Sequence, residues 1–171
     1  VGPTIAAFGS DAQKQFYLPK ILSGECHFSI GYTEPEAGTD LASLKTTAVL
    51  EGDTYVINGQ KVYTSLAGHA DYMWLACRTD PDGARHKGIS LIIVPADAPG
   101  LEKTPMRTMG GNETFACYYD NVRVPASNLV GPENGGWRLI TTQLNHERVA
   151  LMAVGPLQYF TEAVSGWAGK T

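Results

Sequence analysis

Glu147 is the residue whose type and setting most directly indicate chemistry. If the segment from residue 137 onward is a helix, Glu147 lies within the arc of an apolar stripe formed by Ile140, Leu144, Leu151 and Val154. No basic side chain stands three or four positions away, so no neighbour on the helix pairs with the carboxylate. Removal from water makes a carboxylate a stronger base, and this position therefore predicts a general base.

Two other roles for Glu147 stay open at this point. The stripe could face a wet cleft, or Glu147 could form a structural ion pair with another element, because ion-pair networks also place carboxylates on inner faces. The neighbouring Arg148 points away by about a quarter turn and could serve a network or a substrate. The helical pattern alone does not decide between these roles and that of a base.

The segment "GYTEPEAGTDLASL" is a candidate anion site. It has hydroxyls at Thr33 and Thr39, a turn over residues 35–38, and a candidate N-cap at Thr39-Asp40 for a short helical turn over residues 41–44. Free backbone N–H groups at a helix start bind phosphate or pyrophosphate. The alternative is an ordinary acidic surface loop, because such loops are rich in Gly and Pro.

The segment "NGQKVYTSLAG" places one aromatic ring beside two hydroxyls, at Tyr63, Thr64 and Ser65. Such a group could flank a flat heterocycle and form hydrogen bonds with its edge. An ordinary strand with one buried Tyr would look the same, so the segment is informative only in combination with the other two.

The composition of the 171 residues is that of an ordinary globular protein, with 43% hydrophobic and 18% charged residues. The formal net charge of -4 and the lack of a basic cluster argue against nucleic acid as a partner. A small molecule or another protein is expected instead. No apolar run is long enough to span a bilayer, so we expect no membrane insertion.

The Cys and His residues show no ligand spacing, and we expect no metal. Cys26, Cys77 and Cys117 form no C-x-x-C pair, which fits a reducing compartment and predicts a cytoplasmic protein. The sequence starts at Val1 and ends at "GWAGKT" while a helical pattern is still running. We therefore expect a piece of a longer protein.

The elements that position these residues are predicted to be helix, β-domain and helix. Ser10 and Gln13 have the spacing of a reciprocal helix cap, which predicts a short helix interrupted at Pro19 and ended near Gly24. After the β-domain, the segment from residue 137 to 167 predicts a long helix, kinked or split at Gly155-Pro156.

Strand signals fill the region from residue 28 to about 130. "TYVINGQKVYT" predicts a hairpin about Asn58-Gly59, because both turn residues must tolerate positive φ. "DYMWLAC" and "GISLIIV" predict a second hairpin of buried strands, and "ETFACYY" and "NVRVP" add at least one more strand. Together these elements predict an α+β fold with a compact antiparallel sandwich or barrel-like middle domain flanked by helical segments.

The sequence resembles the acyl-CoA dehydrogenase family over essentially its whole length. The resemblance is carried by "YTEPEAGTD", "INGQKVYTS", "YYDNVRVPASNLVGPENGGW" and "LNHERVALMAVGP". It implies that residues 1–27 end an N-terminal helical domain, residues 28–134 form the middle β-domain, and residues 135–171 begin a C-terminal helical domain.

The resemblance implies bound FAD. It places Ile30, Tyr32 and Thr33 along the pyrimidine edge of the flavin, and Gly38 and Thr39 near the phosphates and the CoA thioester. It places a further segment behind the isoalloxazine, close to its N5, and this segment contains Tyr63, Thr64 and Ser65. The common family pattern has Trp at the position of Tyr63 and Thr at that of Ser65. This departure keeps a hydroxyl but alters flavin packing.

The implied reaction is α,β-dehydrogenation of an acyl-CoA, with electrons passed to an electron-transfer flavoprotein or a similar acceptor. In most members the catalytic Glu lies far downstream, and in a minority it lies at the position of Glu147. The resemblance also implies substrate contacts at Thr39, Asn145 and Arg148. It extends to actinobacterial enzymes that act on steroid side-chain CoA thioesters as heterotetramers, so a homo- or heterotetramer is expected.

Two alternatives to a dehydrogenase remain within this fold. One is an acyl-CoA oxidase or flavin monooxygenase, in which reduced flavin meets oxygen. The other is a non-catalytic structural subunit of a heteromeric acyl-CoA dehydrogenase. An unpaired carboxylate on an apolar stripe argues against the structural subunit, although fold alone does not decide.

Overall fold

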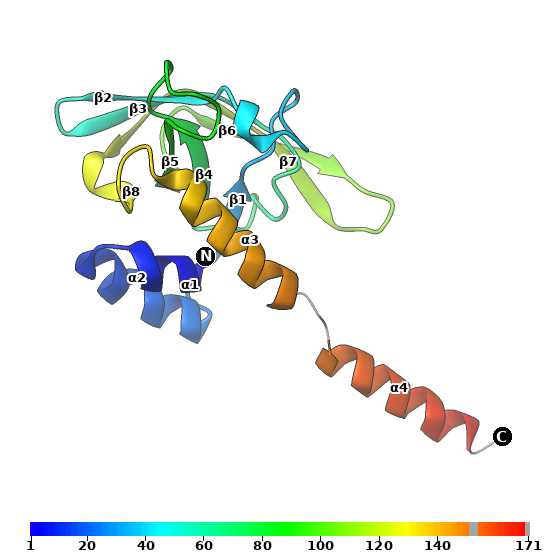
Figure 1. Ribbon diagram of the computed structural model, residues 1–171. Helices are drawn as coiled ribbons and strands as arrows, with labels where there is room; N and C mark the ends of the chain where they lie inside the picture. The colour runs from blue at the N-terminus through cyan, green and yellow to red at the C-terminus, as the bar shows by residue number, and fades with distance from the viewer. Residues whose placement is uncertain (151–153, 170–171) are drawn as a thin grey trace.

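Two helices precede the sheet in the computed structural model, which describes residues 1–150 and 154–169 (Figure 1). They are α1 (Gly2–Phe8), which the sequence did not reveal, and α2 (Asp11–Ser23). The predicted cap of α2 is confirmed: Gln13 N donates to Ser10 Oγ at 3.2 Å, and Ser10 N donates to Gln13 Oε1 at 3.0 Å. These bonds satisfy backbone groups that have no partner within the helix.

The predicted interruption at Pro19 is wrong. The helix α2 continues through Pro19 to Ser23 and ends at Gly24, whose φ of 77° is left-handed. Pro19 leaves the carbonyl of Gln15 without its usual N–H donor, but Gln15 is exposed, so water can supply one. The helix is also fixed at both ends, by the Ser10 cap and by the Gly24 turn.

Eight strands form one mixed sheet in the order β6-β7-β3-β2-β4-β5-β8, and β1 pairs beside β4. Two 3₁₀ turns interrupt the strand region, η1 (Leu41–Ser43) and η2 (Ala126–Asn128). The strands are β1 (Phe28–Gly31), β2 (Thr47–Glu51), β3 (Thr54–Lys61), β4 (Tyr72–Arg78), β5 (Ile89–Pro95), β6 (Leu101–Arg107), β7 (Glu113–Pro125) and β8 (Leu129–Val130).

The predicted α+β class with flanking helices is confirmed, whereas the sheet is mixed and does not close into a barrel. β1 runs parallel to β4, and β2 meets β4 in a short parallel pairing at Thr47 and Arg78. β6 and β8 end the strand order, and no pairing joins them in the described part of the chain. The predicted hairpin of β4 and β5 is confirmed, and the two predicted strand runs after residue 112 form the single strand β7.

The predicted hairpin about Asn58-Gly59 is wrong, because β3 runs straight through both residues. The turn lies instead at Gly52 and Asp53, between the paired residues Glu51 and Thr54. Asn58 and Gly59 mark an irregular register of β3 against β7, where Asn121 N donates to Asn58 Oδ1 at 2.8 Å. The glycine serves a close approach of two backbones rather than a reversal of the chain.

The side chains of β4 and β5 alternate between two hydrophobic cores. One core lies between these strands and the β2, β3 and β7 part of the sheet, and it contains Met73, Leu75, Ile92 and Val94. The second core, here called the helix-side core, lies under α1, α2 and α3 and contains Ile5, Trp74, Ala76, Leu91, Ile93 and Ile140. Strands buried on both faces explain the continuous apolar runs in the sequence.

The predicted long helix is two helices, α3 (Gly136–Ala150) and α4 (Val154–Ala168). Gly155 and Pro156 lie in the first turn of α4, where a missing backbone N–H removes no helical bond. α3 lies next to the sheet and α1, whereas α4 lies apart from them (Figure 1). Leu151 and the side chain of Val154, both part of the predicted stripe, lie outside the described residues.

The irregular register makes Gly59 the least replaceable position of β3. Its φ is 149°, and an added Cβ would lie 2.5 Å from Thr46 Oγ1 and 2.7 Å from Thr46 Cα. We expect Gly59→Ala to lower the free energy of unfolding by about 2–4 kcal/mol, because both the backbone angle and the contact are unfavourable. Urea denaturation of the full-length protein measures this loss.

Gly110→Ala is the matched control, because a Cβ there would meet only Thr108 Oγ1 at 4.0 Å. This control is expected to change the free energy of unfolding by less than about 0.5 kcal/mol. Equal effects of the two substitutions would contradict the close approach at Gly59.

Candidate functional site

Glu147 lies in a cleft of about 260 Å³ where α1, β1 and α3 meet. The cleft brings together residues far apart in the sequence, and its lining includes Pro3, Thr4, Ile30, Gln143, His146 and Glu147. Ile30 and Glu147, two of the residues singled out in the sequence, therefore share one surface. Sequence reasoning missed the contribution of α1, because that helix was not anticipated.

The Glu147 carboxylate is half-buried and stands on the predicted apolar face of α3. On the same face of α3, Ile140 is fully buried, and the half-buried Leu144 packs against the helix-side core. Within residues 1–150 and 154–169, no hydrogen bond or ion pair reaches the Glu147 carboxylate. Glu147 therefore forms no structural ion pair with another described element. It does face a cleft, as the first of the two alternatives predicted.

A chain of hydrogen bonds joins the sheet to α3 directly beneath this cleft. Trp74 Nε1 donates to the Tyr32 hydroxyl at 3.0 Å, and the Tyr32 hydroxyl donates to Gln143 Oε1 at 2.5 Å. All three side chains are buried. Burial raises the pKa of Tyr32 well above its ordinary value, although the Trp74 hydrogen bond opposes the shift, so the hydroxyl keeps its proton.

The segment that follows β1 is fixed by an ion pair in the protein interior. Lys61 and Glu34 are 0% and 6% exposed, and Lys61 Nζ lies 2.8 Å from Glu34 Oε1. Lys61 Nζ also donates to the Tyr32 carbonyl at 3.0 Å. Glu34 accepts two backbone N–H groups, from Lys45 at 2.6 Å and from Thr46 at 2.9 Å. These bonds satisfy the buried charges and fix the backbone between Tyr32 and Glu34.

The ionised forms of this pair are set by opposing effects. Burial favours a neutral Glu34, but the Lys61 ammonium and the hydrogen bonds outweigh it and hold the pKa of Glu34 below its ordinary value. Burial lowers the pKa of Lys61, and Glu34 partly opposes that shift. Sequence reasoning missed this pair, since the two residues are far apart along the chain and neither lies in a charged pattern.

The segment after β3 presents Tyr63 and Ser65 to the outside. Val62 N donates to the Thr33 carbonyl at 2.9 Å, and Thr64 N donates to the Phe115 carbonyl at 3.0 Å. Tyr63 is 68% exposed and has a left-handed φ of 59°. The alternative of an ordinary strand with a buried Tyr is thus wrong: β3 has already ended at Lys61, and the buried hydroxyl is that of Thr64.

The loop with Gly38 and Thr39 is exposed, and the short helical turn predicted after it is present, but without the predicted side-chain cap at Asp40. The 3₁₀ turn η1 covers only Leu41–Ser43, and the Asp40 side chain makes no cap hydrogen bond. The Asp40 carboxylate forms an ion pair with Arg85 instead, which removes it from the capping position. The predicted anion site therefore has only this single 3₁₀ turn, which no side chain caps.

Arg78 ties this loop to the connection between β4 and β5. Among the described residues its guanidinium donates to backbone carbonyls alone, at 2.9–3.4 Å, namely those of Ala42, Leu44, Gly83, Arg85 and Lys87. Two loops are therefore held by one side chain.

The other predicted substrate residues lie outside the cleft. Asn145 and Arg148 are exposed on α3 and do not line it. Within the described residues no three His, Cys, Asp or Glu side chains gather as a metal site. In that same part of the chain, no helix is long and apolar enough to cross a membrane.

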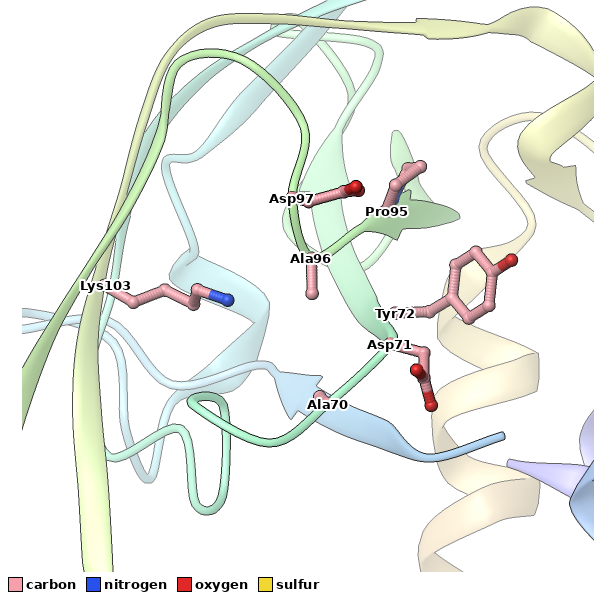
Figure 2. A pocket seen from close by; sticks show the side chains of 7 residues that line it. All are labelled: Ala70, Asp71, Tyr72, Pro95, Ala96, Asp97 and Lys103. Carbon is pink, nitrogen blue, oxygen red and sulfur yellow. The ribbon is translucent and has the colours of Figure 1, made fainter. Parts of the chain in front are cut away.

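A second cavity of about 400 Å³ lies near the ends of β4 and β5 and contains none of the predicted site residues. Figure 2 shows its polar lining, Asp71, Tyr72, Asp97 and Lys103, with the Lys103 side chain pointing toward the middle of the cavity. Asp71 Oδ2 accepts the His27 backbone N–H at 2.8 Å, which gives this carboxylate a structural role.

The sequence profile "Acyl-CoA dehydrogenase, middle domain" matches residues 29–122. The chain belongs to the acyl-CoA dehydrogenase family. It is 60% identical to acyl-CoA dehydrogenase FadE29 of Mycobacterium tuberculosis, over 98% of this chain and 44% of that protein. It is 56% identical to FadE26 of the same organism, over 100% of this chain and 44% of that protein. The chain thus spans less than half the length of these relatives.

Solved structures share the arrangement of this chain. The Tcur3481-Tcur3483 steroid ACAD has a TM-score of 0.91 and 57% identity, over 99% of this chain and 44% of that one. The ChsE4-ChsE5 complex of Mycobacterium tuberculosis has a TM-score of 0.80 and 60% identity, over 85% of this chain and 38% of that one. The resemblance to the acyl-CoA dehydrogenase fold is therefore confirmed.

The contribution of the buried Lys61–Glu34 pair to stability can be tested by removing one of its charges. We expect Lys61→Met to lower the free energy of unfolding by about 3–5 kcal/mol, because it leaves Glu34 as a buried charge without its partner. Denaturant unfolding of the full-length protein, followed by circular dichroism, measures the loss.

Arg123→Ala is the control, because it removes an ion pair with Glu51 in which both side chains are more than half exposed. Its expected effect is at most about 1 kcal/mol. If Lys61→Met proves as mild as this control, the pair does not fix the segment after β1.

Proposed function

We propose that the protein containing this chain catalyses FAD-dependent α,β-dehydrogenation of an acyl-CoA thioester, with Glu147 as the base. The observation that carries the proposal is a carboxylate with no hydrogen bond or ion pair among the described residues, at a cleft beside the apolar Ile30. Membership of the acyl-CoA dehydrogenase family supports the reaction class. A positioned base typically contributes about 10²–10⁴-fold to such a proton transfer.

The residues after β3 fit a flavin. Tyr63 offers an exposed ring, and Ser65 is an exposed residue whose hydroxyl has no hydrogen-bond partner among the described residues. The backbone bonds of Val62 and Thr64 hold these two side chains in place. We assign Tyr63 to pack against the ring system and Ser65 to donate to its edge, while the buried Thr64 anchors the segment. FAD, when bound, accepts the β-hydrogen of the substrate as hydride.

The segment after β1 and its loop supply the remaining contacts. We assign Ile30, Tyr32 and Thr33 to the edge of the flavin, where the Tyr32 and Thr33 carbonyls are fixed by Lys61 and Val62. Gly38 and Thr39 are exposed and available to the phosphates and the CoA thioester. We assign Asn145 and Arg148, both exposed on α3, to the substrate or to the subunits that surround it.

Glu147 removes the α-proton in this proposal. Its carboxylate stands at the cleft with apolar Ile30 and Pro3 nearby, and no described side chain forms an ion pair with it. An apolar acyl group that enters the cleft excludes water from the carboxylate and makes it a stronger base.

The assembly and acceptor are also part of the proposal. Two solved relatives are named as a steroid acyl-CoA dehydrogenase and as a complex of two different chains. We infer a heteromeric assembly, an acyl-CoA substrate that can carry a steroid, and an electron-transfer flavoprotein or similar acceptor. We also retain residues 28–134 as the middle domain, between helical segments at 1–27 and 135–171.

The test is the anaerobic flavin absorbance of the full-length protein, with any partner subunit, after addition of candidate acyl-CoA thioesters. We expect wild type to bleach and Glu147→Gln to retain FAD while bleaching about 10²–10⁴-fold more slowly, because the amide cannot accept the α-proton. Glu102→Gln is the control, since Glu102 is exposed on β6, outside the cleft.

The other outcomes separate the alternatives. Equal bleaching of wild type and Glu147→Gln would move the base to another residue. No bleaching with any thioester would favour the non-catalytic subunit. Rapid reoxidation of the reduced flavin by air, instead of transfer to a flavoprotein, would favour an oxidase or monooxygenase.

A further inference from the structure

The direction of the Gln143 carboxamide is fixed by its neighbours. Trp74 Nε1 can only donate, so the Tyr32 hydroxyl accepts that bond and its own proton is directed to Gln143 Oε1. If the amide were reversed, the proton of the buried Tyr32 hydroxyl would have no acceptor. The Gln143 oxygen is therefore occupied on the side of the sheet, and both N–H groups of Nε2 remain for other partners.

The N–H groups of Gln143 open onto the cleft that holds Glu147. Gln143 is 4% exposed and lines that cleft. Its Nε2 finds no hydrogen-bond partner among the described residues, and the nitrogen is not sealed from solvent. A nearly buried amide loses free energy when its donors stay unpaired. A ligand that brings an acceptor into the cleft removes this penalty.

The charge of the cleft limits which acceptor fits there. Glu147 lies one helical turn from Gln143, and within the described part of the chain no hydrogen bond or ion pair holds its carboxylate. This negative charge repels a carboxylate or a phosphate of a ligand. A carbonyl oxygen carries no net charge and accepts N–H groups. The acceptor that fits is a neutral carbonyl, and an acyl thioester has one on the carbon next to its α-carbon.

We propose that Gln143 is a substrate-binding residue: its Nε2 donates to the thioester carbonyl oxygen of the acyl-CoA while Glu147 takes the α-proton. This inference rests on the proposed function of Glu147. As the Cα–H bond breaks, its proton passes to Glu147 and its electron pair moves toward the carbonyl, so negative charge develops on the thioester oxygen. The pair forms the Cα–Cβ double bond when the β-hydrogen leaves as hydride to FAD. A donor aimed at the thioester oxygen stabilises the transient charge.

An amide suits this position better than a cation does. A Lys or Arg side chain one helical turn from Glu147 would form an ion pair with the carboxylate and make it a weaker base. Gln143 is neutral, so it leaves the base unpaired and still offers donors. The bond from Tyr32, which is itself held by Trp74, restrains the amide, so its donors are directed before the substrate arrives.

The test compares two CoA ligands that differ only at the carbonyl, in the full-length holoenzyme with any partner subunit. The first is the 2-enoyl-CoA product of the acyl-CoA that bleaches wild type fastest, because the product is not dehydrogenated again at the same bond. The second is its thioether analogue, with CH₂ in place of C=O. We expect Gln143→Met to weaken binding of the enoyl thioester by about 3–10-fold and to leave binding of the thioether unchanged.

The rate of flavin bleaching is the second measurement. The proposed hydrogen bond strengthens as charge develops, so Gln143→Met should bleach about 10²–10³-fold more slowly than wild type, a larger loss than that of binding. Gln143→Asn keeps an amide that is one methylene too short to reach both Tyr32 and the ligand, and it should show the same pattern. Unchanged thioether binding shows that each variant is folded.

Thr141→Val is the matched control on α3, because the Thr141 hydroxyl bonds to the carbonyls of Trp137 and Arg138 and does not line the cleft. This control should change neither the affinity for the two ligands nor the rate of bleaching.

The outcomes separate this inference from the proposed function. Unchanged thioester affinity in both Gln143 variants, in a protein that Glu147→Gln inactivates, would overturn the role of Gln143 alone. Equal losses for thioester and thioether would also overturn it, because the acceptor would not be the thioester carbonyl. If Glu147→Gln keeps the wild-type rate, the proposed base fails, and the ligand pair still decides the role of Gln143. A wild type that binds and oxidises no acyl-CoA would overturn the proposed function and this inference with it.

Discussion

The buried pair of Lys61 and Glu34 is the constraint on which the site depends. Removing two charges from water is costly, and the cost is met only because each charge finds several partners. Those partners come from the end of β3, from the segment after β1 and from the two residues just before β2, so the three segments are joined at one point. The Tyr32 carbonyl is one of these partners, so the bond from Lys61 also fixes where the Tyr32 side chain starts. From there the hydroxyl reaches Trp74 in the sheet and Gln143 on α3.

The same constraint explains how an exposed segment can be held in an unfavourable backbone conformation. Tyr63 and Leu66 both have positive φ, which costs energy for residues with a Cβ. The backbone bonds of Val62 to Thr33 and of Thr64 to Phe115 supply the compensation, and Lys61 fixes the chain immediately before them. Strain of this kind, at a conspicuous aromatic side chain, is common where a protein holds a ligand. The exposed segment after β3 is thus tied by backbone bonds to β7 and to the segment after β1.

Structural features that depend on residues close together in the sequence could be predicted, whereas contacts between distant residues could not. The Ser10 cap, the buried strands β4 and β5, and the apolar face around Glu147 follow from spacing alone, because their partners lie within a few residues. The Lys61–Glu34 pair and the chain of hydrogen bonds from Trp74 through Tyr32 to Gln143 join residues far apart along the sequence, so no periodic pattern predicts them. The hairpin predicted at Asn58-Gly59 was wrong because a glycine that permits a close approach of two backbones cannot be distinguished in the sequence from a glycine that permits a turn. The exposure of the Tyr63 ring likewise could not be predicted from the sequence.

Arg78 has a consequence for how this domain can change in length. Surface loops normally accept insertions, and the connection between two antiparallel strands is a usual place for them. Here five carbonyls, from the β4–β5 connection and from the loop between β1 and β2, converge on one guanidinium, so an inserted residue in either segment displaces acceptors of the other. The connection of β4 to β5 is therefore a poor site for a tag or a fused domain. The exposed tip between β6 and β7, where Met109 projects into solvent, has no such tie and is the better point of attachment.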